Sequence, residues 1–598
     1  MKKKNVMTKS PILYIVIFLV WTVLAVFLWY NFALTISGGG YFNTANVSTT
    51  ILVLSRIFLS FNAVFISYFW LNGVKDFIYV IWYYINKGRL IKRHKEIIDV
   101  DTSNANDRVL LVYCTCNDFD GTSLLKSINQ DYNNFKAVIL DDSSDENYLK
   151  QIDEFSKQHN IEVIRRENRI GFKAGNINHY LMREDVKNSY DYVVILDSDE
   201  ILPNNYIKES LKYFYKYENI GIVQANHIST RNRNFFMKIF HIGVNSHWPT
   251  YQTMKHFYGF STMLGHGAMI KRDCYLKAGG FPNLVAEDLC LSIEARGKGY
   301  YVAFAPNIIC EEEYPIDYVA FKKRHSKWTQ GNLEFIKKYT GKIIKSKMKW
   351  YEKWDIVLFT YNLPLTAIFA FFLLSNLVFA PLLHINLGEC YSLWMIIPTI
   401  IFFFSPMLND LIIWSFKLNP IRNLFYFINV IILYGSMLTT SLMSAVLGMF
   451  GKKAKFIVTP KTSQKINLWF ALKSQIPEII LSTVLLLISL CFKNVFSVIL
   501  ILVTGYCSVF LLFFSNKTYN EEQVKKIDAK TAQISLKINK TYLYTKKVEE
   551  SNKNAVNSAS ENNHSSNDLG NQEVDDKLDD KNKLDNEIDD EELKVSHS

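Results

Sequence analysis

Long uncharged stretches of apolar residues lie at both ends of the first 515 positions, and they predict helices that cross a membrane. The first covers 11–34 without a single charge, enough to span a hydrocarbon core of about 30 Å. A second covers 51–85, is interrupted by Arg56 and by Lys75–Asp76, and predicts one returning span followed by an interfacial turn. Lysines before the first stretch place the N-terminus in the cytoplasm. Region 1–95 is therefore predicted to hold two spans.

The C-terminal region 352–515 returns to the same apolar pattern. Four further spans are predicted, at 355–383, 391–414, 479–492 and 495–515. Residues 423–450 are also apolar enough to cross, but basic segments on both sides place both ends in the cytoplasm, so we expect a helix that lies at the interface or re-enters. Residues 516–598 are polar and predict a largely disordered cytoplasmic tail.

Between the two apolar regions, residues 96–351 alternate short apolar runs with helical segments. Strands are predicted at 108–116, 135–140, 161–164 and 192–196. Such alternation predicts a parallel, doubly wound sheet, in which the carboxyl ends of the strands meet at one edge and bind ligands there.

Polar residues follow each predicted strand. In order, they are Thr115, Asn117 and Asp118; Asp141 and Asp142; Arg165, Arg166 and Arg169; and Asp197 and Asp199. Two carboxylates separated by one residue can share a hard divalent cation with a diphosphate. Alone, this D-x-D pattern is more often a solvated turn; the acids and arginines at the neighbouring strand ends favour a site for a metal and a nucleotide.

The net charge of +11 is unevenly distributed along the chain. From Ser551 onward there are 13 acids and 5 lysines, a net of −8, which leaves +19 on the residues before it. That excess suits a domain at an anionic membrane surface that handles an anionic substrate. Nucleic acid is not indicated, because we find no motif that binds it. The eight cysteines contain no C-x-x-C pair, so neither zinc nor disulfides are predicted.

Eight short blocks, taken in order, resemble the family-2 glycosyltransferases and, more narrowly, the membrane-embedded processive cellulose, hyaluronan and chitin synthases. The blocks are TCND at Thr115, LDDSSD at Leu140, RIGFKAGNIN at Arg169, ILDSDE at Ile195, VQANH at Val223, GHGAMIKRDCYLKAGGF at Gly265, AEDLCL at Ala286 and RHSKW at Arg324. The resemblance covers about 10–515. It implies a cytoplasmic α/β domain of the Rossmann-like GT-A fold, inserted between transmembrane helices.

The resemblance also implies roles at the donor site. Asp142 would contact uridine, and Asp199, together with Asp197, would hold Mg²⁺ or Mn²⁺. The residues expected to bind the nucleotide sugar are Thr115, Asn117, Asp118, Asp142, Lys173, Asp197, Arg324 and Lys327. Independently of the family, glycines at 171 and 175 would let a backbone approach a ligand closely while Lys173 presents a cation between them. A flexible surface turn is the alternative there.

The acceptor side is expected around AEDLCL and RHSKW. Asp288 matches the family's general base, although Ala286 stands where the family has threonine. Arg324 and Lys327 replace the glutamine and arginine of the family's Q-x-x-R-W motif, while Trp328 is retained and would stack on the acceptor sugar. An interfacial tryptophan flanked by lysines is the plainer alternative.

A basic segment at 455–465 resembles the F-x-V-T-x-K gating loop of cellulose synthases. The matching residues are Phe456, Val458, Thr459 and Lys461. The resemblance implies that this loop closes over the nucleotide, as lids do elsewhere. A basic loop at the membrane surface is the alternative.

Together these features predict an inverting glycosyltransferase of the plasma membrane, multi-pass, with its catalytic domain in the cytoplasm. It would polymerise a β-linked polysaccharide from a UDP-sugar, UDP-glucose by the resemblance, and pass the chain across the bilayer. Two alternatives stay open: a non-processive enzyme that makes a glycolipid, and a non-catalytic membrane scaffold or transporter with a degenerate domain. The choice of sugar depends on a few pocket contacts that the sequence does not reveal.

Overall fold

The protein is described by a computed structural model over residues 5–37, 48–386 (backbone alone for 363–367), 390–415, 417–451, 466–495, 498–540 and 542–543. The predicted gating residues Phe456, Val458, Thr459 and Lys461 lie outside the described residues, as does the acidic segment after Ser551.

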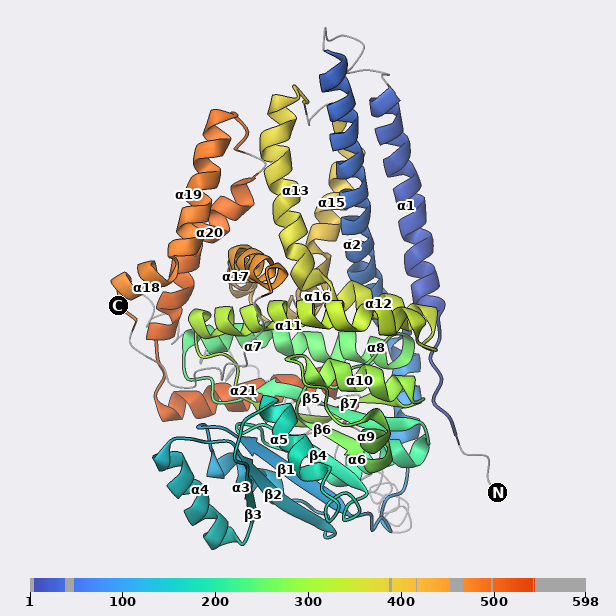
Figure 1. Ribbon diagram of the computed structural model, residues 1–598, viewed down its shortest axis with the longest axis vertical. Helices are drawn as coiled ribbons and strands as arrows, with labels where there is room; N and C mark the ends of the chain where they lie inside the picture. Colours follow the sequence, from blue (N-terminus) through green and yellow to red (C-terminus); the bar gives the residue numbers. More distant parts are fainter. Residues whose placement is uncertain are drawn as a thin grey trace, which may run out of the picture. The chain divides into compact units, whose positions relative to one another are not determined.

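Apolar helices stand upright beside one another above a sheet domain (Figure 1). They are α1 (Ile12–Ser37), α2 (Thr49–Ile98), α13 (Asn362–Leu382), α15 (Leu393–Phe404), α16 (Leu408–Trp414), α19 (Ile476–Cys491) and α20 (Ile499–Phe513). Among the described residues, five helices are long and apolar enough to cross a membrane. The number becomes six if the bent pair of α18 (Leu468–Ser474) and α19 is one span. These helices indicate a membrane protein.

Helix α2 differs from the expectation, because it continues for 50 residues without the predicted interfacial turn. The charges that suggested a turn are buried in its middle. Lys75 Nζ lies 3.0 Å from Asp76 Oδ1 and 3.9 Å from the centroid of the Phe359 ring. Because the two charges compensate each other inside the protein, the helix passes through this position unbroken.

The apolar segment predicted to lie along the membrane surface forms α17 (Pro420–Met449). Figure 1 views α17 nearly along its axis, whereas α1 and α13 stand upright. Hydroxyl groups join it to α11 (Tyr318–Lys345): the Tyr318 hydroxyl donates to Ser436 Oγ at 2.7 Å, and Ser326 and Ser444 Oγ lie 2.7 Å apart. The length and composition of α17 would also suffice for a crossing, so the interfacial position of this helix stays a prediction.

The domain below is built on a seven-stranded sheet in the order β3-β2-β1-β4-β6-β5-β7. The strands are β1 (Val109–Thr115), β2 (Phe135–Asp141), β3 (Glu162–Arg165), β4 (Tyr192–Leu196), β5 (Ile220–Ser229), β6 (Ala268–Lys271) and β7 (Tyr301–Glu312). The predicted neighbours are parallel, with Val109 paired to Phe135 on one side and to Tyr192 on the other. The predicted α/β fold is thus confirmed.

One strand makes the sheet mixed and not fully parallel as predicted. β6 runs antiparallel to both β4 and β5. After β5, the chain stays at the edge where the parallel strands end and forms α7 (Phe235–His247), η2 (Trp248–Gln252) and α8 (Thr253–Tyr258). Since β6 starts from that same edge, it must run in the opposite direction, and no crossover helix is needed.

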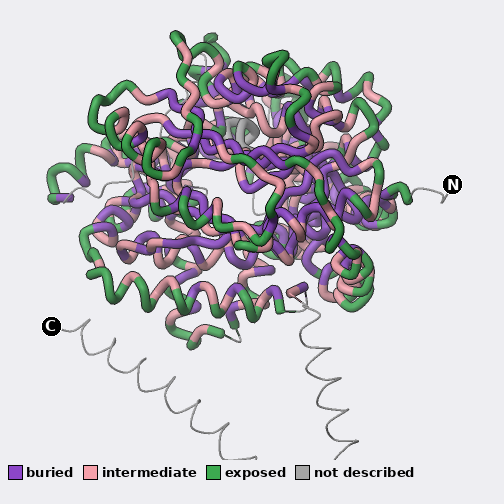
Figure 2. Tube along the Cα trace, turned by 90° about the horizontal axis from the view of Figure 1, so that it is seen from below, coloured by how far each residue is buried: buried purple, intermediate pink, exposed green. Residues whose placement is uncertain are grey.

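Helices cover both faces of the sheet, which explains its nearly continuous apolar strands. On β1, Leu111 and Tyr113 pack with α3 (Gly121–Ile128), α4 (Glu146–His159) and α6 (Tyr206–Lys216). Leu110 and Val112 pack on the other face with α5 (Phe172–Leu181), α9 (Arg272–Ala278) and α10 (Glu287–Gly297). In Figure 2, which looks from below, buried stretches run through the middle and exposed ones follow the periphery.

Residues 521–539 lie in the segment predicted to be a polar, largely disordered tail, yet they form α21 (Glu521–Asn539). The helix packs beside β5 and α7. Its buried positions, Thr531, Ser535 and Asn539, are polar and lie on one face. Next to this face, Val524, Ile527, Ile534 and Ile538 recur at helical spacing and are partly buried, so the sequence did contain a signal for a docked helix, which the prediction of a disordered tail missed.

Candidate active site

A cavity of about 520 Å³ opens where β1, β2 and β4 end. It is also lined by the starts of α5 and α10 and by one face of α11. Ten of the predicted site residues line it: Thr115, Asp118, Asp142, Lys173, Asp197, Asp199, Asp288, Arg324, Lys327 and Trp328. Residues far apart in the sequence therefore share one hollow, as the arrangement of strand ends predicted. Among the predicted residues that the structure describes, Asn117 is missing from the lining.

Asp118 holds two of the strand ends together. Its Oδ1 accepts hydrogen bonds from Thr115 Oγ1 at 3.0 Å and from the Cys116 N–H at 2.8 Å. Its Oδ2 accepts from Ser198 Oγ at 2.7 Å, between the two acids of the D-x-D pattern. In this structure, Asp118 fixes the loop after β1 to the loop after β4.

Asn117 is hydrogen-bonded to the neighbouring loop, which follows β2. It has a positive φ of 58°, and its Oδ1 accepts from the N–H groups of Ser144 at 2.8 Å and Asp145 at 3.0 Å. Asparagine tolerates this left-handed conformation better than most residues. The side chain therefore joins the ends of β1 and β2, and its contact with a nucleotide stays a prediction.

Asp142, at the end of β2, is held by a bidentate pair with Arg166. Arg166 Nε lies 2.8 Å from Oδ1 and Nη2 lies 2.6 Å from Oδ2, and both side chains are only 6% exposed. The planar guanidinium fixes the carboxylate plane in a way that a lysine would not. The sequence showed Arg166 at a strand end, but not its partner.

The glycine-rich loop before α5 is packed against the same arginine. Arg166 donates to the carbonyl oxygens of Ile170 at 2.6 Å and Phe172 at 2.8 Å. A Cβ on Gly175 would lie 2.0 Å from the Ile170 carbonyl oxygen, and Gly171 has a φ of 76°. Both positions therefore require glycine for the loop's own packing, which differs from the expected close approach to a ligand.

Lys173, in the first turn of α5, extends to the D-x-D pattern. Its ammonium pairs with Asp197 Oδ1 and donates to the Gly265 carbonyl at 2.8 Å. Burial lowers the pKa of Lys173, but the charge and hydrogen bond of Asp197, together with the charges of Cys114 and Glu287, raise that pKa above its ordinary value. Lys173 is thus a cation at neutral pH, and it partly neutralises one acid of the D-x-D pattern.

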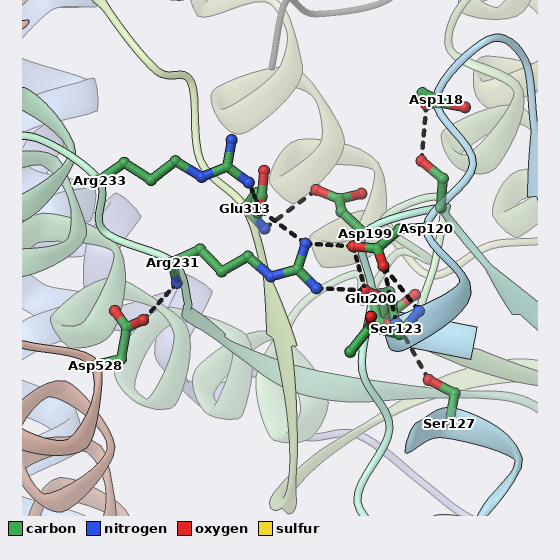
Figure 3. Close-up of polar contacts among 12 residues, drawn as sticks. Asp118, Asp120, Ser123, Ser127, Asp199, Glu200, Arg231, Arg233, Glu313 and Asp528 are labelled. Atoms are coloured by element: carbon green, nitrogen blue, oxygen red, sulfur yellow. Dashed lines mark hydrogen bonds and ion pairs between the residues drawn. The ribbon is translucent and has the colours of Figure 1, made fainter. Parts of the chain in front are cut away.

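Asp199 is oriented by the backbone after β7. Its Oδ2 accepts from the Glu313 N–H at 3.1 Å (Figure 3). Asp197 and Asp199 offer carboxylate oxygens, the ligands that Mg²⁺ and Mn²⁺ prefer. The donor chemistry at this edge therefore fits a hard divalent cation.

A second group that could hold a metal lies outside the cavity lining. Ligand atoms of Glu200, His227 and Cys310 all lie within 4.8 Å of one another, and the three residues are buried. Glu200 is already bonded to His227 Nε2 at 2.9 Å and to the Gly267 N–H at 2.9 Å. Burial would raise the pKa of Glu200, but His266 and His227 lower it to about 2. We interpret the group as an internal charge network that stabilises the end of β4.

The predicted base stands in the first turn of α10. Burial raises the pKa of both Glu287 and Asp288, and the charge of Asp288 raises that of Glu287 further. A carboxylate with a raised pKa is a stronger base when it is deprotonated, as proton removal from a hydroxyl requires. The sequence predicted Asp288 for this position but not the shift.

The face of α11 contributes Arg324, Lys327 and Trp328. The guanidinium carbon of Arg324 lies 4.4 Å from the centroid of the Trp328 ring, which remains 40% exposed. Burial lowers the pKa of Lys327, and the charges of Glu287 and Asp197 partly offset that effect. The arginine that replaces the family's glutamine therefore packs on the tryptophan it precedes.

The cavity continues from Trp328 toward the upright helices. Its lining there is made of residues that the sequence analysis missed, His247, Gln252, Lys255, Phe359 and Thr360. They come from α7, η2, α8 and α12 (Trp350–Thr360). Lys255 Nζ lies 3.7 Å from the centroid of the Phe359 ring. The hollow thus reaches from the acidic strand ends to the residues just before α13.

Comparison with known proteins finds a matching family model and similar curated proteins. Residues 192–443 match the model described as "Glycosyl transferase family group 2". Two curated relatives from Arabidopsis thaliana, named "Probable glucomannan 4-beta-mannosyltransferase 15" and "Probable glucomannan 4-beta-mannosyltransferase 10", are each 26% identical to this chain over 231 and 224 residues. The matches cover 37% and 35% of this chain and 42% and 39% of the relatives, so they span about two fifths of the relatives' length.

Similar solved structures include the mannosyltransferase PcManGT from Pyrobaculum calidifontis in complex with GDP-Man and Mn²⁺. It is 17% identical, with a TM-score of 0.36 over 64% of this chain and 100% of its own. Another is S. aureus TarS 1-349 in complex with UDP-GlcNAc, 14% identical, with a TM-score of 0.30 over 43% of this chain and 75% of its own. Such low scores carry nothing over to this chain. The model matched over residues 192–443 and the curated relatives support a family-2 glycosyltransferase, which confirms that part of the resemblance.

Proposed function

We propose that the protein transfers a hexose from a nucleoside diphosphate sugar to the end of a β-linked polysaccharide, with inversion, and passes the product outward between its own helices. One observation carries the proposal. A single cavity joins acids from the ends of β1, β2 and β4, the cation Lys173, the base Asp288 and the exposed ring of Trp328.

At the donor end, Asp197 and Asp199 would hold Mg²⁺ or Mn²⁺ against the diphosphate. Such an ion, when bound, stabilises the negative charge of the departing diphosphate. Lys173 adds a second positive charge from the protein. Asp142, whose carboxylate is held by Arg166, would accept a hydrogen bond from the nucleobase of the donor. Thr459 and Lys461 of the predicted gating loop would then close over the phosphates.

At the acceptor end, Asp288 removes the proton from the attacking hydroxyl. The oxygen of that hydroxyl forms a bond to the anomeric carbon while the bond from that carbon to the diphosphate oxygen breaks, and the proton stays on the Asp288 carboxylate. Attack opposite the leaving group inverts the configuration, so an α-linked donor gives a β-linked product. The Trp328 ring supports the acceptor sugar by stacking.

The donor is predicted to be UDP-glucose by the sequence resemblance. GDP-mannose is the second candidate, because the names of the curated relatives refer to a mannosyltransferase. The test is to incubate the purified full-length protein in lipid nanodiscs with UDP-glucose, UDP-N-acetylglucosamine, UDP-galactose and GDP-mannose. Released nucleotide and the linkage of the product are then measured. Release of UDP with UDP-glucose alone supports the first donor, and release of GDP alone supports the second.

Product length decides between the polymer and the two alternatives. A water-insoluble or high-mass β-linked product supports a processive synthase. A product of one or two sugars confined to the organic phase would instead show a glycolipid-forming enzyme. No nucleotide release above a heat-inactivated control with any donor would favour the non-catalytic scaffold. Protease protection in sealed vesicles tests the proposed cytoplasmic side and multi-pass insertion.

A further inference from the structure

The chain after the last apolar helix returns to the sheet domain and is bonded to its backbone. Thr518 bridges Asn234, the Tyr519 N–H donates to the Arg233 carbonyl at 2.9 Å, and the Phe235 N–H donates to the Lys517 carbonyl at 3.3 Å. Helix α21 begins directly afterwards, with Asn520 and Gln523 forming a capping box. The entry of this helix is thus fixed beside the loop that follows β5.

One side chain of α21 holds the turn of that loop. Asp528 Oδ2 accepts from the Arg231 N–H at 2.8 Å. Its Oδ1 accepts from the Asn232 N–H at 3.1 Å and from Asn232 Nδ2 at 2.7 Å. Arg231 has a φ of 55°, a conformation that is unfavourable for a residue with a side chain, so an outside partner is needed to keep it.

Two arginines of the same loop pair with Glu313, which contacts Asp199 of the D-x-D pattern (Figure 3). Arg231 Nη1 lies 3.1 Å from Glu313 Oε1, and Arg233 Nη2 lies 2.8 Å from the same oxygen. Arg231 also pairs with Asp120, which caps α3 after β1. The Glu313 side chain is 5% exposed, whereas Arg231 and Arg233 are 26% and 39% exposed, so the carboxylate is shielded from water while both guanidinium groups are partly solvated.

Glu313 in turn donates its backbone N–H to Asp199 Oδ2 at 3.1 Å. A continuous chain of contacts therefore runs from α21, through the arginine loop and Glu313, to a carboxylate of the donor site. From this chain we infer that α21 positions Asp199 for cation binding, with Asp528 as the positioning residue. The inference rests on the proposed role of Asp199 as a metal ligand.

The test measures binding of Mn²⁺ alone to the full-length protein in detergent, by the loss of the free-ion electron paramagnetic resonance signal. Asp528→Ala removes three hydrogen bonds to the loop, and the Mn²⁺ concentration for half-saturation is expected to rise about tenfold. Asp528→Asn keeps one acceptor oxygen and is expected to give a rise of about threefold. Glu522→Ala is the matched control: Glu522 lies on the same helix but is 77% exposed, and its partner is Lys526, on the helix itself.

Arg233→Gln provides a variant that leaves α21 intact. This variant removes one of the two cations that pair with Glu313, and it is expected to weaken Mn²⁺ binding by about threefold. The melting temperature of the protein should not change. Half-saturation within a factor of two of the wild type in Asp528→Ala and Arg233→Gln would overturn the inference and leave the proposed function standing. A wild-type protein that binds no Mn²⁺ would overturn the proposed metal role, and the inference with it.

Discussion

At the donor end of the cavity the charges are paired within the protein, whereas at the acceptor end burial dominates. Asp142 is clamped by Arg166, and Asp197 by Lys173. Around α10 and α11, by contrast, burial raises the pKa of Glu287 and Asp288 and lowers that of Lys327. Fixed charges suit an anionic group that must be held still. Shifted pKa values suit a place where a proton must move.

The largest expected effect is at the acceptor end. Asp288→Asn keeps the shape of the side chain but cannot accept the hydroxyl proton, so kcat should fall about 10³-fold. Donor affinity, measured by calorimetry, should stay within a factor of two because Asp142 and Lys173 are untouched. Glu287→Gln is the matched neighbour and should retain most of the activity. Normal turnover in Asp288→Asn would remove this residue from the chemistry.

The next effect is at the donor end. Chelation with EDTA should abolish nucleotide release, and Mn²⁺ or Mg²⁺ should restore it, because the ion proposed at Asp197 and Asp199 stabilises the charge of the leaving diphosphate. Asp199→Ala should lower kcat/KM about 10²-fold. Asp185→Ala, a surface acid paired with Arg183, serves as the control. Turnover that is indifferent to chelation would mean that the paired charges of this end suffice alone.

A smaller effect is expected at Trp328, where the acceptor ring would stack. Trp328→Ala should raise the KM for an oligosaccharide acceptor about tenfold, while Trp328→Phe should raise it only about threefold. kcat should change little, because the ring does not take part in bond formation. Trp350→Phe, at an equally exposed tryptophan of α12, tests for a general effect of losing an indole. An unchanged acceptor KM would move the acceptor site elsewhere in the cavity.

The smallest effect concerns the pH dependence of activity. Asp288 works only when deprotonated, so activity is lost as the pH falls through its raised pKa, at a higher pH than for an ordinary carboxylate. Burial raises the pKa of Asp288, whereas the charge of Asp288 helps to raise the pKa of Glu287 to about 7, so Asp288 loses its proton while Glu287 is still neutral. Glu287→Gln should therefore leave the acid limb of the kcat/KM profile in place, with activity at neutral pH nearly unchanged. A limb that moves to lower pH would show that the charge of Glu287 also raises the pKa of Asp288.

Strand ends predicted the acids of the site, whereas the family resemblance supplied the residues on helices, which are Lys173, Asp288, Arg324, Lys327 and Trp328. Apolar runs located β1, β2, β3 and β4 to within two residues at either end, and the rule that parallel strands end at one edge brought Asp142 and Asp199 into one cavity. Strands β5, β6 and β7 were not predicted. Length is not the reason, because β5 and β7 have 10 and 12 residues, and β3, which was predicted, has four residues, as β6 does. The roles of Arg166 and Asp528 were not predicted either, because they depend on partners far away in the sequence or on a polar face of a helix.

The unbroken α2 has a mechanical consequence. At about 1.5 Å per residue, its 50 residues measure about 75 Å, more than twice the roughly 30 Å of a hydrocarbon core. Its lower end is anchored in the sheet domain, where His94 bonds to the Tyr213 hydroxyl at 2.9 Å. The helix thus acts as a rod that sets how far the sheet stands from the lipid. Where the apolar part of α2 crosses a bilayer, a change in bilayer thickness is therefore expected to move the sheet domain, and the cavity at its strand ends, relative to the lipid.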